Sequence, residues 1–250
     1  MKEKYIVWKN LGETPLEALN RLAEELSIPK DVPLTYAGRL DPAAEGFLII
    51  LVGDECKKKS KYTDLNKTYM AEILVGVSTD SFDLLGVPTY RENVKPKSLT
   101  ALAKDVETYL DTCVGKFNQT YPPYSSKTVD GKQLHEHARE GNEIELPTHE
   151  VELISYEDVT TEDFLSEDVL TRVGELTTAV AGDFRQAEIV QAWAELNLPE
   201  KMQLISITLK VGSGFYVRQL AEDLGKYLGT GACLYSLVRT EIGEYKHADL

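Results

Sequence analysis

The apolar run "FLIILV", from Phe47 to Val52, constrains the fold of this chain more than any other stretch. These six consecutive apolar residues are followed by Gly53. Such a run is too short for a typical helix but typical of a buried strand. It is also far too short to cross a lipid bilayer. We therefore expect a protein built at least partly around a buried sheet.

Strand-like and helix-like segments alternate irregularly along the rest of the chain. Thr14, Pro15 and Glu17 form a capping box with proline at the first helical position, which predicts a helix to about Leu26. Because there is no regular βαβ rhythm, we expect an α+β (mixed α/β) fold rather than a doubly wound sheet. Further strands are expected at residues 5–8, 67–77, 148–159, 203–211 and 233–243, a strand followed by a loop at 112–131, and helices at 99–110, 133–141, 182–196 and 215–229.

Length and cysteine content narrow the class of protein. A chain of 250 residues can bury a substantial core, and we expect one domain over residues 1–250. Cys56, Cys113 and Cys233 are far apart and odd in number, which argues against a disulfide framework or a thiolate metal site. His135 and His137 have no third ligand nearby, so no metal is expected. The amino terminus does not resemble a signal peptide, so the expected location is the cytoplasm, with no membrane association.

Charge is distributed very unevenly. The formal net charge of −14 argues against a polyanionic partner. However, residues 150–168 contain eight acidic residues and no lysine or arginine, whereas residues 56–69 contain five lysines and one aspartate, Asp64. Phosphates respond to the charge at the binding face, so a nucleic-acid ligand attracted by local charge is not excluded.

The stretch "YAGRLDPAAEG", from Tyr36 to Gly46, carries the first candidate for chemistry, Asp41. Asp-Pro between two glycines is ordinary turn chemistry. Alternatively, Asp41 is a nucleophile held by positive charge, or Asp41 and Glu45 form the carboxylate pair of a hydrolase. The stretch alone leaves these interpretations open.

Five ordered blocks together resemble TruB-type tRNA pseudouridine synthases. The resemblance extends from about Gly12 to Tyr245 and is weakest between residues 142 and 200. Its most diagnostic parts are Leu-Asp-Pro and Gly-x-Tyr-x-Arg. The blocks are "AGRLDPAAEGFLIILVGDECK", "KTY" at 67–69, "STDSFDLLG" at 78–86, "YSSKTVDGKQLHEHAREG" at 124–141 and "GFYVRQLAEDLGKYLGTGACLYSLVR" at 214–239.

The resemblance implies a pseudouridine synthase fold, in which helices and loops flank a mixed, mostly antiparallel central sheet. It also implies catalytic roles: Asp41 as nucleophile, Arg218 as its partner, and Tyr69 as the ring that stacks on the target uracil and helps remove a proton. The resemblance places Tyr216 and Leu237 in the nucleotide pocket, and we expect the basic run at 57–61 to contact phosphates. The expected substrate-binding residues are Tyr36, Tyr216, Leu237, Lys57, Lys58 and Lys67.

The reaction that the resemblance implies suits these residue types. Conversion of uridine to pseudouridine breaks the N1 glycosidic bond, joins C5 to C1′ and releases the C5 proton, and it needs no metal or cofactor. A guanidinium in contact with a carboxylate keeps that carboxylate ionised and directs it. An aromatic platform compensates part of the cost of extruding a stacked base.

The chain departs from the family pattern just before Asp41. Tyr36 and Arg39 stand where TruB-type enzymes usually have histidine and threonine. With Arg39, the sequence before Pro42 reads Arg-Leu-Asp, which resembles the motif of the ribosomal and RluA-like pseudouridine synthases.

No PUA domain is expected after the catalytic domain. We expect a monomer that acts on U55 in the T-loop of tRNA and grips the T-stem-loop with an insertion at about 119–141. The alternatives are the same chemistry on ribosomal RNA and a non-catalytic tRNA-binding chaperone.

Overall fold

One sheet runs through the whole molecule. The computed structural model describes residues 2–90 and 95–246, and within them nine strands join in one sheet whose main path is β1-β3-β12-β4-β11-β10-β7. All pairs in this sheet are antiparallel except β3 with β12, so the predicted α+β fold with a mixed, mostly antiparallel sheet is confirmed. The strands are β1 (Lys4–Lys9), β2 (Leu34–Ala37), β3 (Glu45–Val52), β4 (Lys67–Val75), β7 (Gly115–Thr120), β10 (Thr148–Leu165), β11 (Lys201–Val211), β12 (Ala232–Ile242) and β13 (Tyr245–Lys246).

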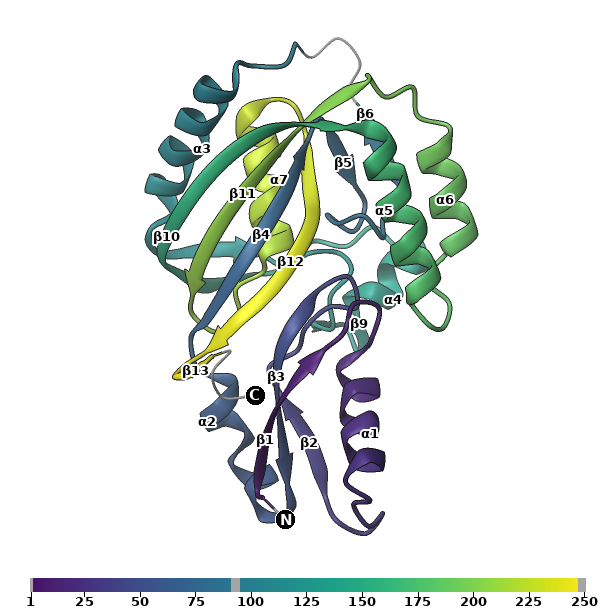
Figure 1. Cartoon of the computed structure of the whole chain (residues 1–250), viewed down its shortest axis with the longest axis vertical. Coiled ribbons are helices and arrows are strands. Elements are labelled where there is room, and N and C mark those ends of the chain that lie inside the picture. Colours follow the sequence, from purple (N-terminus) through teal and green to yellow (C-terminus); the bar gives the residue numbers. More distant parts are fainter. Residues whose placement is uncertain (1, 91–94, 247–250) are drawn as a thin grey trace.

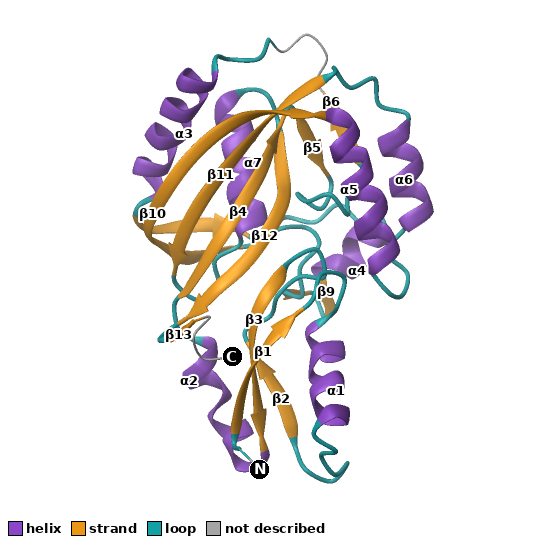
Figure 2. Ribbon diagram, in the orientation of Figure 1, coloured by secondary structure: helices purple, strands orange, loops and turns teal. Residues whose placement is uncertain are grey.

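Helices cover both faces of the large curved part of this sheet (Figures 1 and 2). Ile73 of β4 packs in a core cluster with residues of α3 and α7, whereas its neighbour Leu74 packs in a second cluster with residues of α5 and α6. Side chains alternate between the two faces of a strand, so both faces of β4 are buried. The helices are α1 (Pro15–Glu25), the 3-10 helix η1 (Gly53–Lys58), α2 (Lys59–Thr63), α3 (Leu99–Cys113), α4 (Leu134–Arg139), α5 (Ser166–Ala179), α6 (Gln186–Ala194) and α7 (Val217–Leu228).

A smaller part of the molecule, built from β1, β2, β3, α1 and α2, lies below the large sheet in Figure 1. It joins that sheet through a short parallel pairing, in which Glu45 and Gly46 of β3 face Val238 and Arg239 of β12. Gly46 has a φ of +118°, and a Cβ at this position would lie 2.3 Å from the carbonyl oxygen of Arg239. The two parts can approach this closely only because residue 46 is glycine.

Most predicted elements are present, with shifted ends. The run from Phe47 to Val52 is a buried strand, as predicted. The helix after Thr14 has both hydrogen bonds of the predicted capping box. Gly76, with a φ of +103°, divides the predicted strand at 67–77 into β4 and β5. Among the described helices, none has the length and apolar character needed to cross a membrane.

Three further features differ from the sequence predictions. Strand β10 continues to Leu165, beyond the predicted end at residue 159, and carries most of the acidic stretch. Helix α5, which follows it, was not predicted. The helix expected at 182–196 begins only at Gln186, because Arg185 adopts a left-handed conformation with φ of +58°. Two small hairpins complete the description: β5 (Val77–Thr79) with β6 (Pro88–Tyr90), and β8 (Thr128–Val129) with β9 (Lys132–Gln133).

Candidate active site

Asp41 lies in the loop that connects β2 to β3. The amide of Ala44 donates to the Asp41 carbonyl at 3.0 Å, and the amide of Gly12 donates to the Pro42 carbonyl at 2.9 Å. The sequence therefore forms the turn that Asp-Pro chemistry predicts. The Asp41 side chain remains 41% exposed, so the turn presents the carboxylate to solvent.

Arg218, the second residue of α7, holds this carboxylate. Its Nε donates to Oδ2 of Asp41 at 2.7 Å, although the Arg218 side chain is only 5% exposed. Its other two nitrogens donate to the carbonyls of Ser81 at 2.8 Å and Tyr124 at 3.1 Å. Every nitrogen of the guanidinium is thus engaged, which fixes its direction. The contact expected between Asp41 and Arg218 is present.

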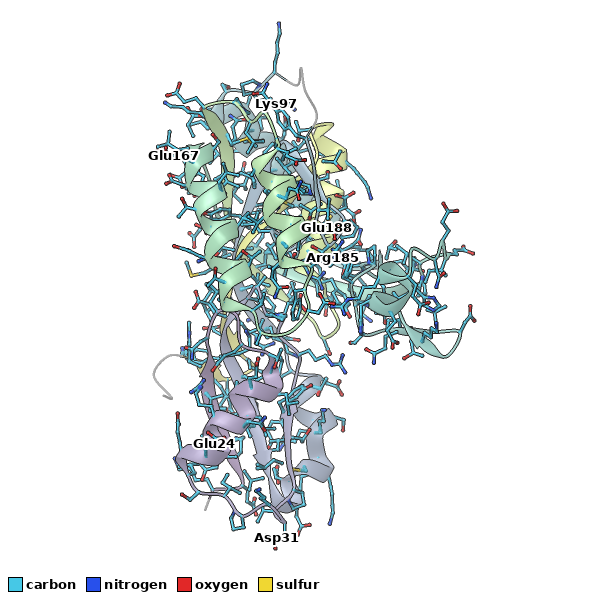
Figure 3. The ribbon with its side chains drawn as sticks, turned by 90° about the vertical axis from the view of Figure 1, so that its right-hand side faces the viewer. Glu24, Asp31, Lys97, Glu167, Arg185 and Glu188 are labelled. Atoms are coloured by element: carbon cyan, nitrogen blue, oxygen red, sulfur yellow. The ribbon has the colours of Figure 1, made fainter. Side chains whose placement is uncertain are left out.

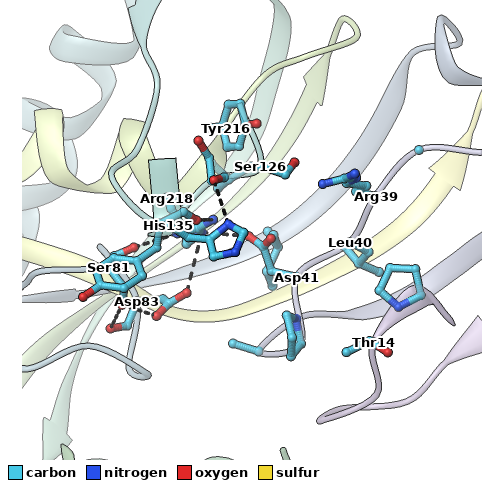
Figure 4. Close-up of a pocket in the computed structure, with 18 of the residues that line it drawn as sticks. Thr14, Arg39, Leu40, Asp41, Ser81, Asp83, Ser126, His135, Tyr216 and Arg218 are labelled. Atoms are coloured by element: carbon cyan, nitrogen blue, oxygen red, sulfur yellow. Dashed lines mark hydrogen bonds and ion pairs between the residues drawn. The ribbon is translucent and has the colours of Figure 1, made fainter. Parts of the chain in front are cut away.

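Asp83 is a second carboxylate beside Arg218. One of its oxygens lies 3.6 Å from Arg218 Nε, and the other accepts from Ser81 Oγ at 2.6 Å and from the Leu85 amide at 3.0 Å. Burial raises the pKa of Asp83, and the attraction of Arg218 opposes this shift. Burial alone would lower the pKa of Arg218, but Asp41 and Asp83 outweigh it and the pKa is raised. Arg218 therefore stays charged between the two aspartates (Figure 4).

Asp41 and Arg218 line a cavity of about 620 Å³ between the two parts of the molecule. This volume lies within the range of sites that hold small ligands. The cavity brings together residues that are far apart in the chain. Seven of the nine predicted site residues line it: Tyr36, Asp41, Lys67, Tyr69, Tyr216, Arg218 and Leu237.

Aromatic and apolar side chains form one wall of the cavity. Tyr69 of β4 and Leu237 of β12 are both 8% exposed, and Tyr216 directly precedes α7. Burial, together with the nearby Asp41 carboxylate, raises the pKa of Tyr216. The wall thus offers flat apolar surface beside an ionisable carboxylate.

Comparison with known proteins assigns this arrangement to a family. The sequence model described as "TruB family pseudouridylate synthase (N terminal domain)" matches residues 31–175, more than half of the chain. The chain belongs to the TruB family. It is 31% identical over 244 residues to tRNA pseudouridine synthase B of Listeria monocytogenes, covering 97% of this chain and 67% of that protein. It is 34% identical over 215 residues to tRNA pseudouridine synthase B of Shouchella clausii, covering 86% of this chain and 59% of that protein.

Solved structures show the same fold at greater distance. A chain of the Cbf5-Nop10-Gar1 complex superposes with a TM-score of 0.57 at 16% identity, covering 98% of this chain and 50% of the other. A chain of an H/ACA RNP bound to a substrate RNA containing 2′-deoxyuridine superposes with a TM-score of 0.55 at 15% identity, covering 98% of this chain and 48% of the other.

In this TruB family protein, the two lysines predicted as substrate-binding residues in the basic run are not part of the cavity lining. Lys57 and Lys58 are on η1, do not line the cavity, and form ion pairs with Asp54 and Glu55 at 2.6 and 2.7 Å. Lys67 does line it, but its ammonium donates to two backbone carbonyls, and burial lowers its pKa to about 8. The structure therefore does not bring Lys57 and Lys58 to the other predicted site residues.

Arginines supply the positive charge at the cavity instead. Its charged lining has six basic residues and two acidic ones, Asp41 and Asp83, and one of the basic residues, Arg185, pairs with Asp80 just outside it at 2.8 Å. The lining is therefore locally positive in a chain whose net charge is −14. Sequence reasoning assigned no role to Asp83, Arg185 or Arg239, although Asp83 and Arg239 lie in the quoted blocks. The basic lining residues are Arg39, Lys67, Arg139, Arg185, Arg218 and Arg239.

The segment at 119–141 borders the cavity on one side. It contains the hairpin β8–β9 and α4, and it projects from the body of the molecule in Figure 3. Its base is fixed by Tyr124, whose carbonyl binds Arg218 and whose ring lies 4.8 Å from the Arg185 guanidinium. Arg139, at the end of α4, donates to the Asp183 carbonyl at 2.7 Å.

The described residues contain no group of three or more His, Cys, Asp or Glu side chains placed to hold a metal ion.

Proposed function

We propose that this TruB family protein is an RNA pseudouridine synthase that isomerises U55 in the T-loop of tRNA, with Asp41 as nucleophile. The observation that carries the proposal is the pairing of a half-exposed carboxylate with a buried guanidinium, at 2.7 Å, in a cavity with aromatic walls. Its relatives from Listeria and Shouchella are named tRNA pseudouridine synthase B, which supports tRNA as the substrate.

The geometry of Asp41 suits attack on the sugar of a uridine. The contact with Arg218 favours the ionised carboxylate and directs Oδ2. Among the described residues, no hydrogen bond is made to Oδ1, so this oxygen is available for the substrate. The isomerisation is redox-neutral and transfers nothing to a second molecule, so the proposal includes neither a cofactor nor a metal.

Tyr69 is the proposed stacking surface for the uracil ring. A target base in folded RNA must leave its stack, which costs a few kcal/mol, and stacking on an aromatic ring returns roughly 1–3 kcal/mol. We propose that Tyr69 also assists the removal of the C5 proton. Tyr216 and Leu237 complete the wall against which the base turns.

The locally positive lining of the cavity supports RNA as the ligand. Phosphate attraction depends on the charge at the binding face, and six basic residues line this one. Within a single catalytic domain, the segment at 119–141 would grip the T-stem-loop, Tyr36 would contact the RNA, and Lys57 and Lys58 would contact phosphates outside the cavity. We propose that the protein acts as a monomer in the cytoplasm.

The alternatives are separated by particular observations. Glu45 does not line the cavity, so the structure offers no support for an Asp41/Glu45 hydrolase. The same chemistry on ribosomal RNA remains the second candidate, since Arg39, part of the Arg-Leu-Asp motif, does line the cavity. A non-catalytic chaperone would bind tRNA without changing it.

Tritium release from RNA labelled at C5 of uridine tests the proposal directly, because pseudouridine formation releases that hydrogen. We expect the purified protein to release about one tritium per tRNA transcript, and none from a transcript that has cytidine at position 55. Release from a ribosomal RNA transcript but not from tRNA would establish the alternative substrate. Binding of tRNA with no release from either RNA would contradict the enzymatic proposal.

A further inference from the structure

The turn between β11 and α7 carries two residues of the site, Tyr216 and Arg218. The backbone at Gly214 is left-handed, with a φ of +83°. Tyr216, the residue before the first turn of α7, makes no capping hydrogen bond with its own side chain. A helix start without such a cap leaves amide groups that need other partners. The position of this turn must therefore be fixed by contacts from elsewhere in the chain.

Gln119 of β7 supplies one of these contacts. Its side chain is 1% exposed and binds the backbone of Tyr216 at both ends. Gln119 Oε1 accepts from the Tyr216 amide at 2.8 Å, and Nε2 donates to the Tyr216 carbonyl at 3.0 Å. The side-chain amide thus pairs with the peptide groups as a neighbouring strand would, two residues before Arg218.

His149 of β10 supplies the second contact. It lies directly opposite Gln119 in the pairing of β10 with β7. Its Nδ1 lies 3.1 Å from the Gln119 carbonyl oxygen, and its Nε2 lies 2.9 Å from the Gly214 carbonyl oxygen. The imidazole ring thereby links the strand that carries Gln119 to the turn that carries Tyr216.

Aromatic packing keeps the His149 ring in this place. Tyr121 stacks on it with ring centroids 3.9 Å apart, and Tyr216 meets it edge to face at 6.0 Å. Tyr216 is therefore fixed twice, through its backbone by Gln119 and through its ring by His149 and Tyr121.

We propose that Gln119 and His149 are positioning residues that hold the turn from Gly214 to Tyr216, and so set the direction of Tyr216 and Arg218 in the site. The inference rests on the proposed function, because its catalytic consequence requires that Arg218 orients Asp41. Neither side chain lines the cavity, and Gln119, although it begins the segment at 119–141, is only 1% exposed, so neither needs to touch the RNA. Loss of either should slow the chemical step and leave tRNA binding nearly unchanged, since misplacement by about 1 Å can cost as much as 100-fold in rate.

The test compares Gln119→Met, which keeps the length of the side chain but removes both hydrogen bonds, with Asn118→Met on the exposed neighbouring position of β7. For Gln119→Met we expect kcat for tritium release to fall by roughly tenfold or more, with KM for tRNA within about threefold of wild type. Hydrogen exchange of the Tyr216 amide, measured without RNA, should accelerate by roughly tenfold or more because its acceptor is lost. Asn118→Met should match the wild type in all three measurements.

The second variant, His149→Phe, keeps the ring that stacks on Tyr121 but removes both nitrogens. We expect the same loss in kcat with KM preserved, and a double variant with Gln119→Met should lose less than the product of the single losses, because both residues act on one turn. If Gln119→Met does not fold, Gln119→Glu, which retains the acceptor and loses the donor, takes its place with the same expectation for kcat.

The outcomes separate this inference from the proposed function. A wild-type protein that releases no tritium from tRNA contradicts the proposed function, and the exchange rate of the Tyr216 amide still tests the contact itself. An active wild type with unchanged kcat in both Gln119→Met and His149→Phe overturns the positioning role. A fall in kcat in Gln119→Met without faster exchange of the Tyr216 amide also overturns it, because the effect would not pass through the turn.

Discussion

Arg218 and Asp41 are 177 residues apart in the chain, yet their side chains meet at 2.7 Å. One lies at the start of α7 on the large sheet and the other in the loop before β3 in the smaller part of the molecule. Arg239 of β12, which is fully buried, fixes this loop by donating to the carbonyls of Phe47 at 2.7 Å, Arg39 at 3.0 Å and Gly38 at 3.3 Å. The contact between Asp41 and Arg218 therefore depends on how the two parts are joined.

Arg218→Lys should nearly abolish turnover while leaving tRNA affinity within about threefold. A lysine keeps the charge but cannot reach Asp41, Ser81 and Tyr124 together, and loss of a single well-placed donor costs about 100- to 1,000-fold in rate. Single-turnover tritium release and filter binding measure the two quantities. Arg172→Lys on α5, which can keep its ion pair with Glu175, is the matched control. Turnover near the wild-type rate would show that the guanidinium geometry is not needed.

Asp83→Asn should lower kcat by about tenfold, less than Arg218→Lys does, because an electrostatic contact 3.6 Å from Arg218 is lost while the contact with Asp41 remains. The asparagine oxygen can still accept from the Leu85 amide, so the fold should persist. Asp105→Asn on α3, which removes an ion pair with Lys97 outside the cavity, serves as the control. The same kcat in Asp83→Asn and wild type would contradict a role for this carboxylate.

Gly46→Ala should destabilise the protein by at least about 2 kcal/mol, because the backbone is in a conformation that L residues rarely adopt and the new methyl group would collide with Arg239. Urea unfolding followed by circular dichroism measures the change. Gly174→Ala provides the contrast: this glycine is in α5 with open space around it, so alanine should stabilise by roughly 0.5–1 kcal/mol. Equal effects of the two substitutions would argue against a close approach of β3 and β12.

Lys9→Met should change how stability depends on pH. Lys9 is fully buried, its ammonium donates to the carbonyls of Asn10 and Glu13, and burial lowers its pKa from 10.5 to about 8. Below pH 8 the lysine is charged in both the folded and unfolded states, so the whole cost of burying the charge is present. Between pH 8 and 10.5 only the unfolded state keeps the proton, so the stability of the wild type relative to Lys9→Met should rise by about 3 kcal/mol.

Urea unfolding of both proteins at pH 7 and pH 10.5 measures this difference. Lys67, whose pKa is also lowered to about 8, is present in both proteins, so its contribution cancels. A constant difference in the free energy of unfolding between the two pH values would show that the buried amine does not titrate in this window.

Local patterns were enough to predict elements whose signals lie within a few residues. The six apolar residues of β3 and the capping box of α1 are examples. Helix α5 was not predicted although its buried residues Val169, Val173 and Leu176 have helical spacing, because the acidic stretch continues into its first turn. The end of β4 depends on the positive φ of Gly76, and the periodicity of apolar residues in the sequence does not reveal a backbone angle.

The site itself was predicted from ordered motifs and not from local pattern. Asp41 and Arg218 were named because the blocks that contain them resemble one family. Asp83 and Gln119 were not predicted as site residues. Asp83 contacts Arg218 and Gln119 contacts Tyr216, and each partner is more than 90 residues away in the chain, so these contacts exist only in the folded structure. Lys57 and Lys58 do not line the cavity, because they pair with Asp54 and Glu55 on the same 3-10 helix, and their role as phosphate contacts stays a prediction.

The most direct test of the account is tritium release by Asp41→Asn, with Glu45→Gln as the neighbouring control. Asparagine has nearly the same shape and can remain beside Arg218, but it cannot act as an ionised nucleophile. We predict that Asp41→Asn loses at least about 1,000-fold in turnover while binding tRNA within about threefold of wild type, and that Glu45→Gln is nearly unaffected. Turnover by Asp41→Asn at the wild-type rate would contradict the central claim.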